Sequence, residues 1–149
     1  MKLSRVIRFV AAAAGTTAIE FGMLSPVLMM SSLGIYEFGR WGWTYEALQE
    51  AASQGARCAA IGEAACESSG SFSASNTESY VQGVAAGWGL TVPTSDITVN
   101  NSTSCGTISG FSQVQISYVF TSVVTKIIPT GPSGTTVTAT SCYPNTPAA

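Results

Sequence analysis

The chain has 149 residues, enough for one small domain and a membrane anchor. Only 9% of the residues are charged and 46% are hydrophobic, whereas soluble proteins average about 25% charged residues. This composition excludes intrinsic disorder, which requires high charge and low hydrophobicity, and favours a membrane-embedded or densely assembled protein. After residue 15 the chain has three basic and eight acidic residues, a formal charge of −5. Nucleic-acid binding needs a basic surface, so we expect no nucleic-acid partner.

The segment from Thr16 to Tyr36 is long and apolar enough to span a bilayer. It has 21 residues, of which Glu20 is the only charged one, and a membrane helix needs about 20. A carboxylate at membrane depth is costly and usually has a function. Three of the six basic residues lie within the first eight positions, which predicts a cytoplasmic N-terminus. We therefore expect a leader at 1–15, a membrane segment at 16–36 and an extracytoplasmic domain at 37–149.

Two features of this segment leave alternatives open. A conventional secretory signal peptide would have its apolar core before the small residues at the cut. Here the strongest hydrophobic stretch follows Gly15, so we favour an anchor. Pro26 lies inside the segment, where an interior proline removes a helix hydrogen bond. It either kinks the helix harmlessly or opens it locally so that subunits can pack.

The helical pattern continues beyond the membrane segment. Apolar residues recur at spacings of three and four, which indicates one face of an amphipathic helix. We expect a single helix from Thr16 to about Ile61, with Tyr36, Trp41, Trp43 and Tyr45 where hydrocarbon meets water. The side chains on this face become smaller along the chain, from aromatic residues to Ala and Gly. In chain order they are Phe38, Trp41, Tyr45, Leu48, Ala52, Gly55 and Ala59.

The remaining chain predicts a second short helix and a small sheet. Residues 67–76 are rich in Ser and Gly and are expected to form a loop. The capping-box pattern Ser75–Glu78 should open the helix, which should end near Gly87 or Gly89. Runs of β-branched residues predict strands, and the runs of turn-forming residues between them predict turns. The strands are expected at Ile97–Asn101, Val114–Val124 and Thr135–Ser141, with turns at Ser102–Gly110 and Pro129–Gly134.

These elements predict an α+β fold. The economical topology is a three-stranded antiparallel meander, with one face packed on the small residues of the long helix. All four cysteines lie on the predicted outer side, where an oxidising compartment favours disulfides. The meander brings the end of its third strand to the start of its second, which predicts Cys105–Cys142 and leaves Cys58–Cys66. The alternative is four free buried thiols.

The sequence lacks the residues of common catalytic and metal sites. It has no histidine, which excludes Ser-His-Asp and Cys-His catalysis, and no C-x-x-C pair that would favour zinc. Glycine patterns for nucleotide binding are also missing. Glu63 and Glu67 stand one helical turn apart, but a solvated helix end explains them. We expect no enzyme activity, no cofactor and no metal.

One stretch of the chain resembles a known family. Gly15–Phe21 resembles the cleavage motif of class III signal peptides. The continuation is similar to the TadE-like family of pseudopilins, and the similarity is carried by Phe21–Leu28, Leu33–Arg40 and Ala47–Arg57. The resemblance implies a pilin-like fold and a minor pseudopilin of a tight-adherence (Flp-type) pilus, a cell-adhesion fibre. It also implies cleavage after Gly15 by a prepilin peptidase at the bacterial inner membrane. The other partners it implies are pilin and pseudopilin subunits and the pilus assembly machinery.

Within that resemblance, the processing positions are Gly15, Thr16, Glu20 and Phe21. Cleavage would leave a free amine on Thr16, and the Glu20 carboxylate of one subunit could pair with the amine of another. A buried carboxylate without a cation is disfavoured, so this pairing would fix the register of subunits. Alternatively, Glu20 recruits only the peptidase, or has no such role. Two other functions remain open, namely an uncleaved membrane-anchored binding module and a secreted enzyme or inhibitor.

Overall fold

The computed structural model describes residues 3–123 and 134–145, with side chains from residue 17 onward. Contacts divide the chain into two units, Met1–Gly39 and Arg40–Ala149. The predicted turn at Pro129–Gly134 falls mainly outside the described residues. The predicted second strand, Val114–Val124, ends at Phe120 instead, because residues 121–123 are not in a strand, and Val124 itself lies outside the described residues. The fold is α+β, as predicted, with a long N-terminal helix, a short helix and a three-stranded antiparallel sheet.

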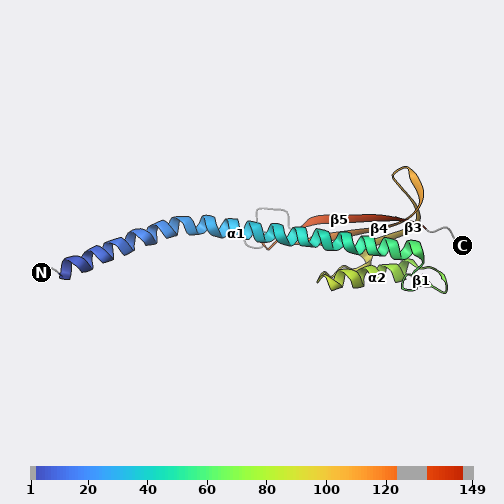
Figure 1. Cartoon of the computed structure of the whole chain (residues 1–149), viewed down its shortest axis with the longest axis horizontal. Helices are drawn as coiled ribbons and strands as arrows, with labels where there is room; N and C mark the ends of the chain where they lie inside the picture. Colours follow the sequence, from blue (N-terminus) through green and yellow to red (C-terminus); the bar gives the residue numbers. More distant parts are fainter. Residues whose placement is uncertain (1–2, 124–133, 146–149) are drawn as a thin grey trace. The chain divides into compact units, whose positions relative to one another are not determined.

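The long helix α1 spans Leu3–Ile61 (Figure 1). It covers the predicted range and also includes most of the leader. The helix continues through Pro26, so this proline does not end it. The hydroxyls of Ser31 and Ser32 donate to the carbonyl of Leu28, at 3.0 and 2.7 Å. Such back-bonding satisfies polar side chains within their own helix, which leaves the outside of this segment largely apolar.

A small hairpin precedes the second helix. Its strands β1, Glu67–Ser68, and β2, Ser71–Phe72, are antiparallel, so the prediction of a plain loop here was wrong. The turn between them needs positive φ at Ser69 and Gly70, a conformation that two-residue hairpin turns favour. Strands of two residues are too short to produce an alternating pattern in the sequence.

The second helix α2 spans Ala74–Gly87 and begins two residues earlier than predicted. Its N-cap is Ser73, whose side chain accepts a hydrogen bond from the backbone N–H of Asn76. The predicted capping box starting at Ser75 was therefore wrong. The predicted end near Gly87 or Gly89 is confirmed, since the last helical residue is Gly87. There the N–H of Leu90 donates to the carbonyl of Ala85, and Gly89 adopts a φ of +80°, as in glycine-terminated helices.

The sheet follows a short 3-10 helix, η1, at Thr94–Asp96. Its strands run in the order β3-β4-β5 and are all antiparallel, as the predicted meander requires. The first two strands are longer than predicted and meet in a tight turn, so most of Ser102–Gly110 is strand rather than loop. Two register shifts between Asn100 and Ser104 bend this hairpin away from the sheet (Figure 1). The bounds are Ile97–Cys105 for β3, Ile108–Phe120 for β4 and Thr135–Pro144 for β5.

One hydrophobic core lies between the C-terminal half of α1, α2 and the sheet. The small-residue part of the predicted helical face is buried there, whereas Trp41 and Tyr45 are partly exposed and Phe38 is largely exposed. The aromatic part of that face lies outside the core, because α2 and β4 end near this level of α1, and its place at the membrane edge stays a prediction. The core residues are Leu48, Ala51, Ala52, Ala56, Val81, Ala85, Val92, Ile97, Val114, Ile116, Phe120, Val137 and Ala139.

Gly55 lies where α1 packs closely against α2. A Cβ atom added there would overlap Cγ2 of Val81 on α2 and lie 3.5 Å from Cγ2 of Val114 on β4. Both valines are fully buried, and valine is stiff at χ1. Neither side chain can turn aside without disturbing the core.

We expect Gly55→Ala to lower the free energy of unfolding by about 1 kcal/mol, because overpacking of about 1–3 kcal/mol exceeds the gain in helix propensity of about 1 kcal/mol. Gly42→Ala on the same helix is the matched control, since nothing lies within 4 Å of an added Cβ there. Its free energy of unfolding should rise. Chemical denaturation in detergent measures both changes, and equal effects of the two substitutions would contradict the close approach.

Two disulfides brace the second unit. Cys58 pairs with Cys66, and Cys105 pairs with Cys142, which are the pairings expected from the sequence. The second bridge forms by a different route from the one predicted. Cys105 ends β3 rather than preceding β4 in a loop, and the bent β3–β4 hairpin brings its Cα to 6.5 Å from that of Cys142 on β5. No free cysteine occurs among the described residues.

Candidate functional site

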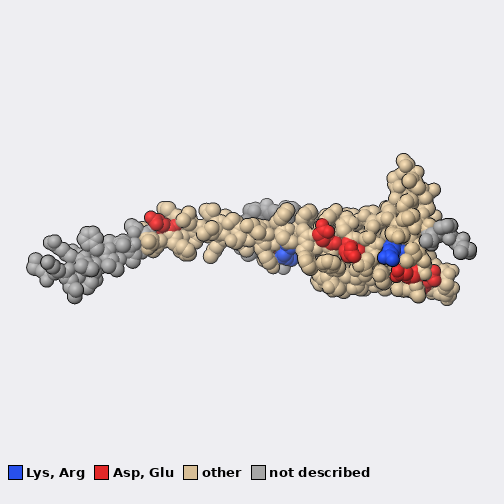
Figure 2. Space-filling model, viewed as in Figure 1, with Lys and Arg blue, Asp and Glu red and all other residues tan. Residues whose placement is uncertain are grey.

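The N-terminal part of α1 exposes an almost continuous apolar surface. Among the described residues, α1 is the one helix long and apolar enough to cross a membrane, over Thr17–Ile61. On the face shown in Figure 2, charged groups are rare along α1 between the grey residues and the Arg40–Ala149 unit. Folding leaves many large hydrophobic side chains uncovered, including Ile19, Phe21, Met23, Leu24, Val27, Leu28, Met29, Met30, Leu33 and Ile35. This surface is suited to lipid or to other apolar helices.

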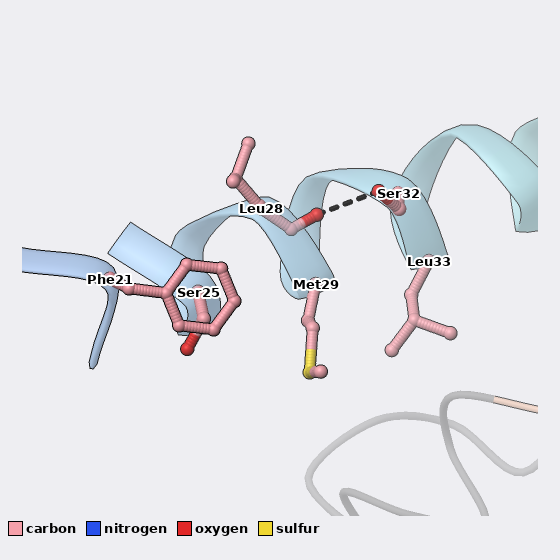
Figure 3. Close-up of a pocket in the computed structure, with 6 residues that line it drawn as sticks. All are labelled: Phe21, Ser25, Leu28, Met29, Ser32 and Leu33. Atoms are coloured by element: carbon pink, nitrogen blue, oxygen red, sulfur yellow. Dashed lines mark hydrogen bonds between the residues drawn. The ribbon is translucent and has the colours of Figure 1, made fainter. Parts of the chain in front are cut away.

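One face of this segment carries a shallow hollow (Figure 3). The residues that line it recur at spacings of three, four and one, so they share one side of the helix. The two serines of the hollow are small, and the hydroxyl of Ser32 is bonded to the Leu28 carbonyl. The hollow can therefore receive a bulky apolar side chain with little polar surface to desolvate. It is lined by Phe21, Ser25, Leu28, Met29, Ser32 and Leu33.

Glu20 is exposed on this apolar helix. The sequence from Thr17 to Gly39 contains no Lys or Arg, so this stretch supplies no cation to Glu20. Gly15 and Thr16 are helical in backbone, and their side chains lie outside the described part. Phe21 is 70% exposed and lines the hollow next to Glu20. The processing and pairing roles assigned to these four residues from the sequence stay predictions.

The second unit holds no group of acidic, Cys or His residues arranged like a metal site, within the residues described. Its most connected polar cluster links the three long strands, through residues inside β3 and β4 and the residue that follows β5. Buried Ser112 on β4 donates to Asn101 of β3, and Asn145 after β5 donates through Nδ2 to the carbonyl of Asn101 at 2.6 Å. Such satisfied buried networks stabilise a fold, and we assign this cluster a structural role.

Aromatic residues gather where α1 enters the second unit. The rings of Trp43 and Trp88 meet edge to face at 5.2 Å, and the Trp43 indole donates to the carbonyl of Trp88 at 3.4 Å. Arg40 lies over the ring of Phe120 at 5.3 Å. Sequence reasoning placed Trp41, Trp43 and Tyr45 at a membrane edge but missed Trp88 and Phe120. No local signal connects them to α1, because they arrive from α2 and β4.

Comparison with known proteins identifies the first part of this helix. The family model described as TadE-like protein matches residues 15–57. We call residues 15–57, which are similar to this family, the TadE-like segment. The match begins at Gly15, contains Glu20 and the hollow, and ends within the core-forming part of α1. No curated protein and no solved structure matches the chain.

The TadE-like segment indicates a component associated with a tight-adherence pilus system. The same segment contains the candidate membrane anchor. It does not include α2 or the sheet, so the architecture of the second unit is known from the structure alone.

Proposed function

We propose that the protein is a minor pseudopilin that helps build or operate a tight-adherence (Flp-type) pilus. Its TadE-like segment crosses the bacterial inner membrane once, with the N-terminus in the cytoplasm and the disulfide-braced unit in the periplasm. The observation that carries this proposal is the TadE-like match over an uncovered apolar segment in which Glu20 is the only charged residue before Glu37. The role is structural, with no catalysis and no cofactor.

A prepilin peptidase removes residues 1–15 in this proposal. The new N-terminus is the amine of Thr16, four residues before Glu20. In an assembled bundle of such helices, the Glu20 carboxylate of one subunit pairs with the Thr16 amine of another pilin or pseudopilin. The surrounding apolar surface excludes water, which makes an unpaired carboxylate costly and a misaligned neighbour unfavourable. The charge pair thus selects the vertical register, while the apolar helix faces supply contact area.

N-terminal sequencing of the protein from membranes tests this function. We expect Thr16 as the first residue in cells with the peptidase and Met1 in cells without it. Gly15→Ile should retain the leader in both, because a branched side chain blocks the approach to the backbone that glycine permits. Gly22→Ala is the matched control, since an added Cβ there meets nothing within 4 Å.

The other outcomes point to the competing functions. An intact Met1 in cells that cleave other prepilins would favour an uncleaved, membrane-anchored binding module. A first residue downstream of Tyr36 would favour a secreted protein and would contradict both membrane-anchored functions.

A further inference from the structure

All three tryptophans of the chain gather at one end of the Arg40–Ala149 unit. Trp41 and Trp43 lie on α1, and Trp88 caps the C-terminal end of α2. Trp88 is 45 positions from Trp43 in the sequence, yet its backbone carbonyl accepts the Trp43 indole N–H. Trp43 is 58% exposed and Trp88 38% exposed. We call Trp41, Trp43 and Trp88 the tryptophan face.

The end of β4 extends this apolar region. Phe120, the last residue of β4, lies beneath the guanidinium of Arg40, and exposed Val119 and Val123 are its chain neighbours. Three separate elements therefore place apolar or aromatic groups at the same end of the unit. The opposite end of α2 begins at Ser73, close to Cys66, and carries no tryptophan.

The composition of this end suits the boundary between acyl chains and lipid headgroups. Tryptophan concentrates there because its ring is apolar and its N–H is polar. Arginine can bury its aliphatic stem and keep its charge in the headgroup layer. The chain enters the unit at Arg40, directly after the apolar segment. The expected membrane segment, 16–36, ends about one helical turn before Arg40.

We propose that the tryptophan face lies in the outer headgroup–acyl boundary of the bilayer that α1 crosses. The folded unit then contacts lipid through the end of α2, in addition to its covalent attachment through α1. The occupant of this face is the phospholipid of the same membrane. The inference rests on the anchoring part of the proposed function and adds to it a second, sequence-remote contact with the membrane.

Depth-dependent fluorescence quenching tests this contact. The full-length double variant Trp41→Phe/Trp43→Phe leaves Trp88 as the only tryptophan and keeps an aromatic ring at each position. The protein is reconstituted in phosphatidylcholine vesicles brominated either near the headgroup or near the ends of the acyl chains. We expect roughly twofold quenching of Trp88 by shallow bromine, as for an interfacial tryptophan, and little quenching by deep bromine.

Two control variants start from a chain in which all three tryptophans are phenylalanine. Ile108→Trp places the probe at the β3–β4 turn, where Ile108 is 63% exposed, and bromine at either depth should leave it unquenched. Leu28→Trp places the probe in the apolar segment, and deep bromine should quench it most. As a second measurement, Trp88→Phe in the otherwise native chain should remove part of the shallow quenching. A folded state is checked by formation of both disulfides.

The outcomes separate this inference from the proposed function. If Leu28→Trp is quenched and Trp88 is not, the lipid contact is wrong and the anchor stands. Trp88 shielded from both bromolipid and aqueous acrylamide would mean that protein covers the face, which also overturns the inference. If neither Trp88 nor Leu28→Trp is quenched, the anchoring part of the proposed function is wrong as well.

Discussion

Glu20→Ala is expected to reduce co-purification of the protein with other pilus subunits by about a hundredfold or more, because breaking a buried ion pair costs about 3–5 kcal/mol. In the proposed pairing, the substitution leaves the Thr16 amine of the neighbouring subunit in an apolar bundle. That amine has lost its hydration and no longer has a carboxylate to compensate for the loss. Glu20→Gln preserves size and hydrogen bonding but not charge, so it should behave almost as Ala does. Affinity capture from detergent-solubilised membranes measures the loss.

Glu46→Ala is the matched control for this experiment. Glu46 is an exposed acid on the same helix, outside the apolar segment, and its loss should leave co-purification unchanged. N-terminal sequencing of each Glu20 variant distinguishes failed pairing from failed cleavage, because Glu20 could act only through the peptidase. Wild-type co-purification of a correctly cleaved Glu20→Ala chain would end the pairing hypothesis.

Reduction of Cys105–Cys142 is expected to destabilise the second unit by about 4 kcal/mol in the chain-entropy model. The bridge closes a sequence separation of 37 residues, whereas Cys58–Cys66 closes one of 8. The shorter loop should contribute only about 2.5 kcal/mol by the same relation. Loop length alone predicts that Cys105–Cys142 stabilises the unit more than Cys58–Cys66 does. This ranking is a stricter test than either absolute value.

Single-bridge chains allow each contribution to be measured without changing the packing. One chain carries Cys58→Ala and Cys66→Ala, and the other carries Cys105→Ala and Cys142→Ala. Each is unfolded with denaturant in its oxidised and reduced forms, and the difference gives the contribution of the remaining bridge. If reducing Cys58–Cys66 lowered the free energy of unfolding more than reducing Cys105–Cys142 did, the prediction that Cys105–Cys142 contributes more stability would be wrong.

The long helix could be predicted because its signal is strong and local, and the disulfide pairs could be predicted from the expected order of the strands. A 21-residue apolar run with Glu20 as its one charged residue predicts a membrane helix. The small apolar residues from Leu48 to Ala59 predict that the same helix extends into the core. Cysteine pairing followed once a three-stranded meander was assumed. The TadE-like match confirms the resemblance carried by the same residues.

The missed features depend on contacts between distant segments. Ser73 and Ser75 are equally good caps by type, and only the path of the β1–β2 hairpin favours Ser73. The Ser- and Thr-rich stretch from Ser102 to Ser109 resembles a turn in isolation, yet pairing with its partner strand holds it extended. Trp88 joins the other two tryptophans only after α2 packs against α1.

The hydrogen bonds of Asn145 and the Cys105–Cys142 disulfide, which hold the end of β5 to its neighbours, also determine how the unit would respond to mechanical force. The backbone N–H of Asn145 donates to the carbonyl of Gly110, and its side chain reaches β3 through Asn101. Three residues earlier, Cys142 is bonded covalently to Cys105. Tension applied beyond Asn145 therefore passes into β3 through the disulfide instead of peeling β5 from β4 one hydrogen bond at a time. A pull on this end of β5 therefore meets a covalent bond before the strand can separate from the sheet.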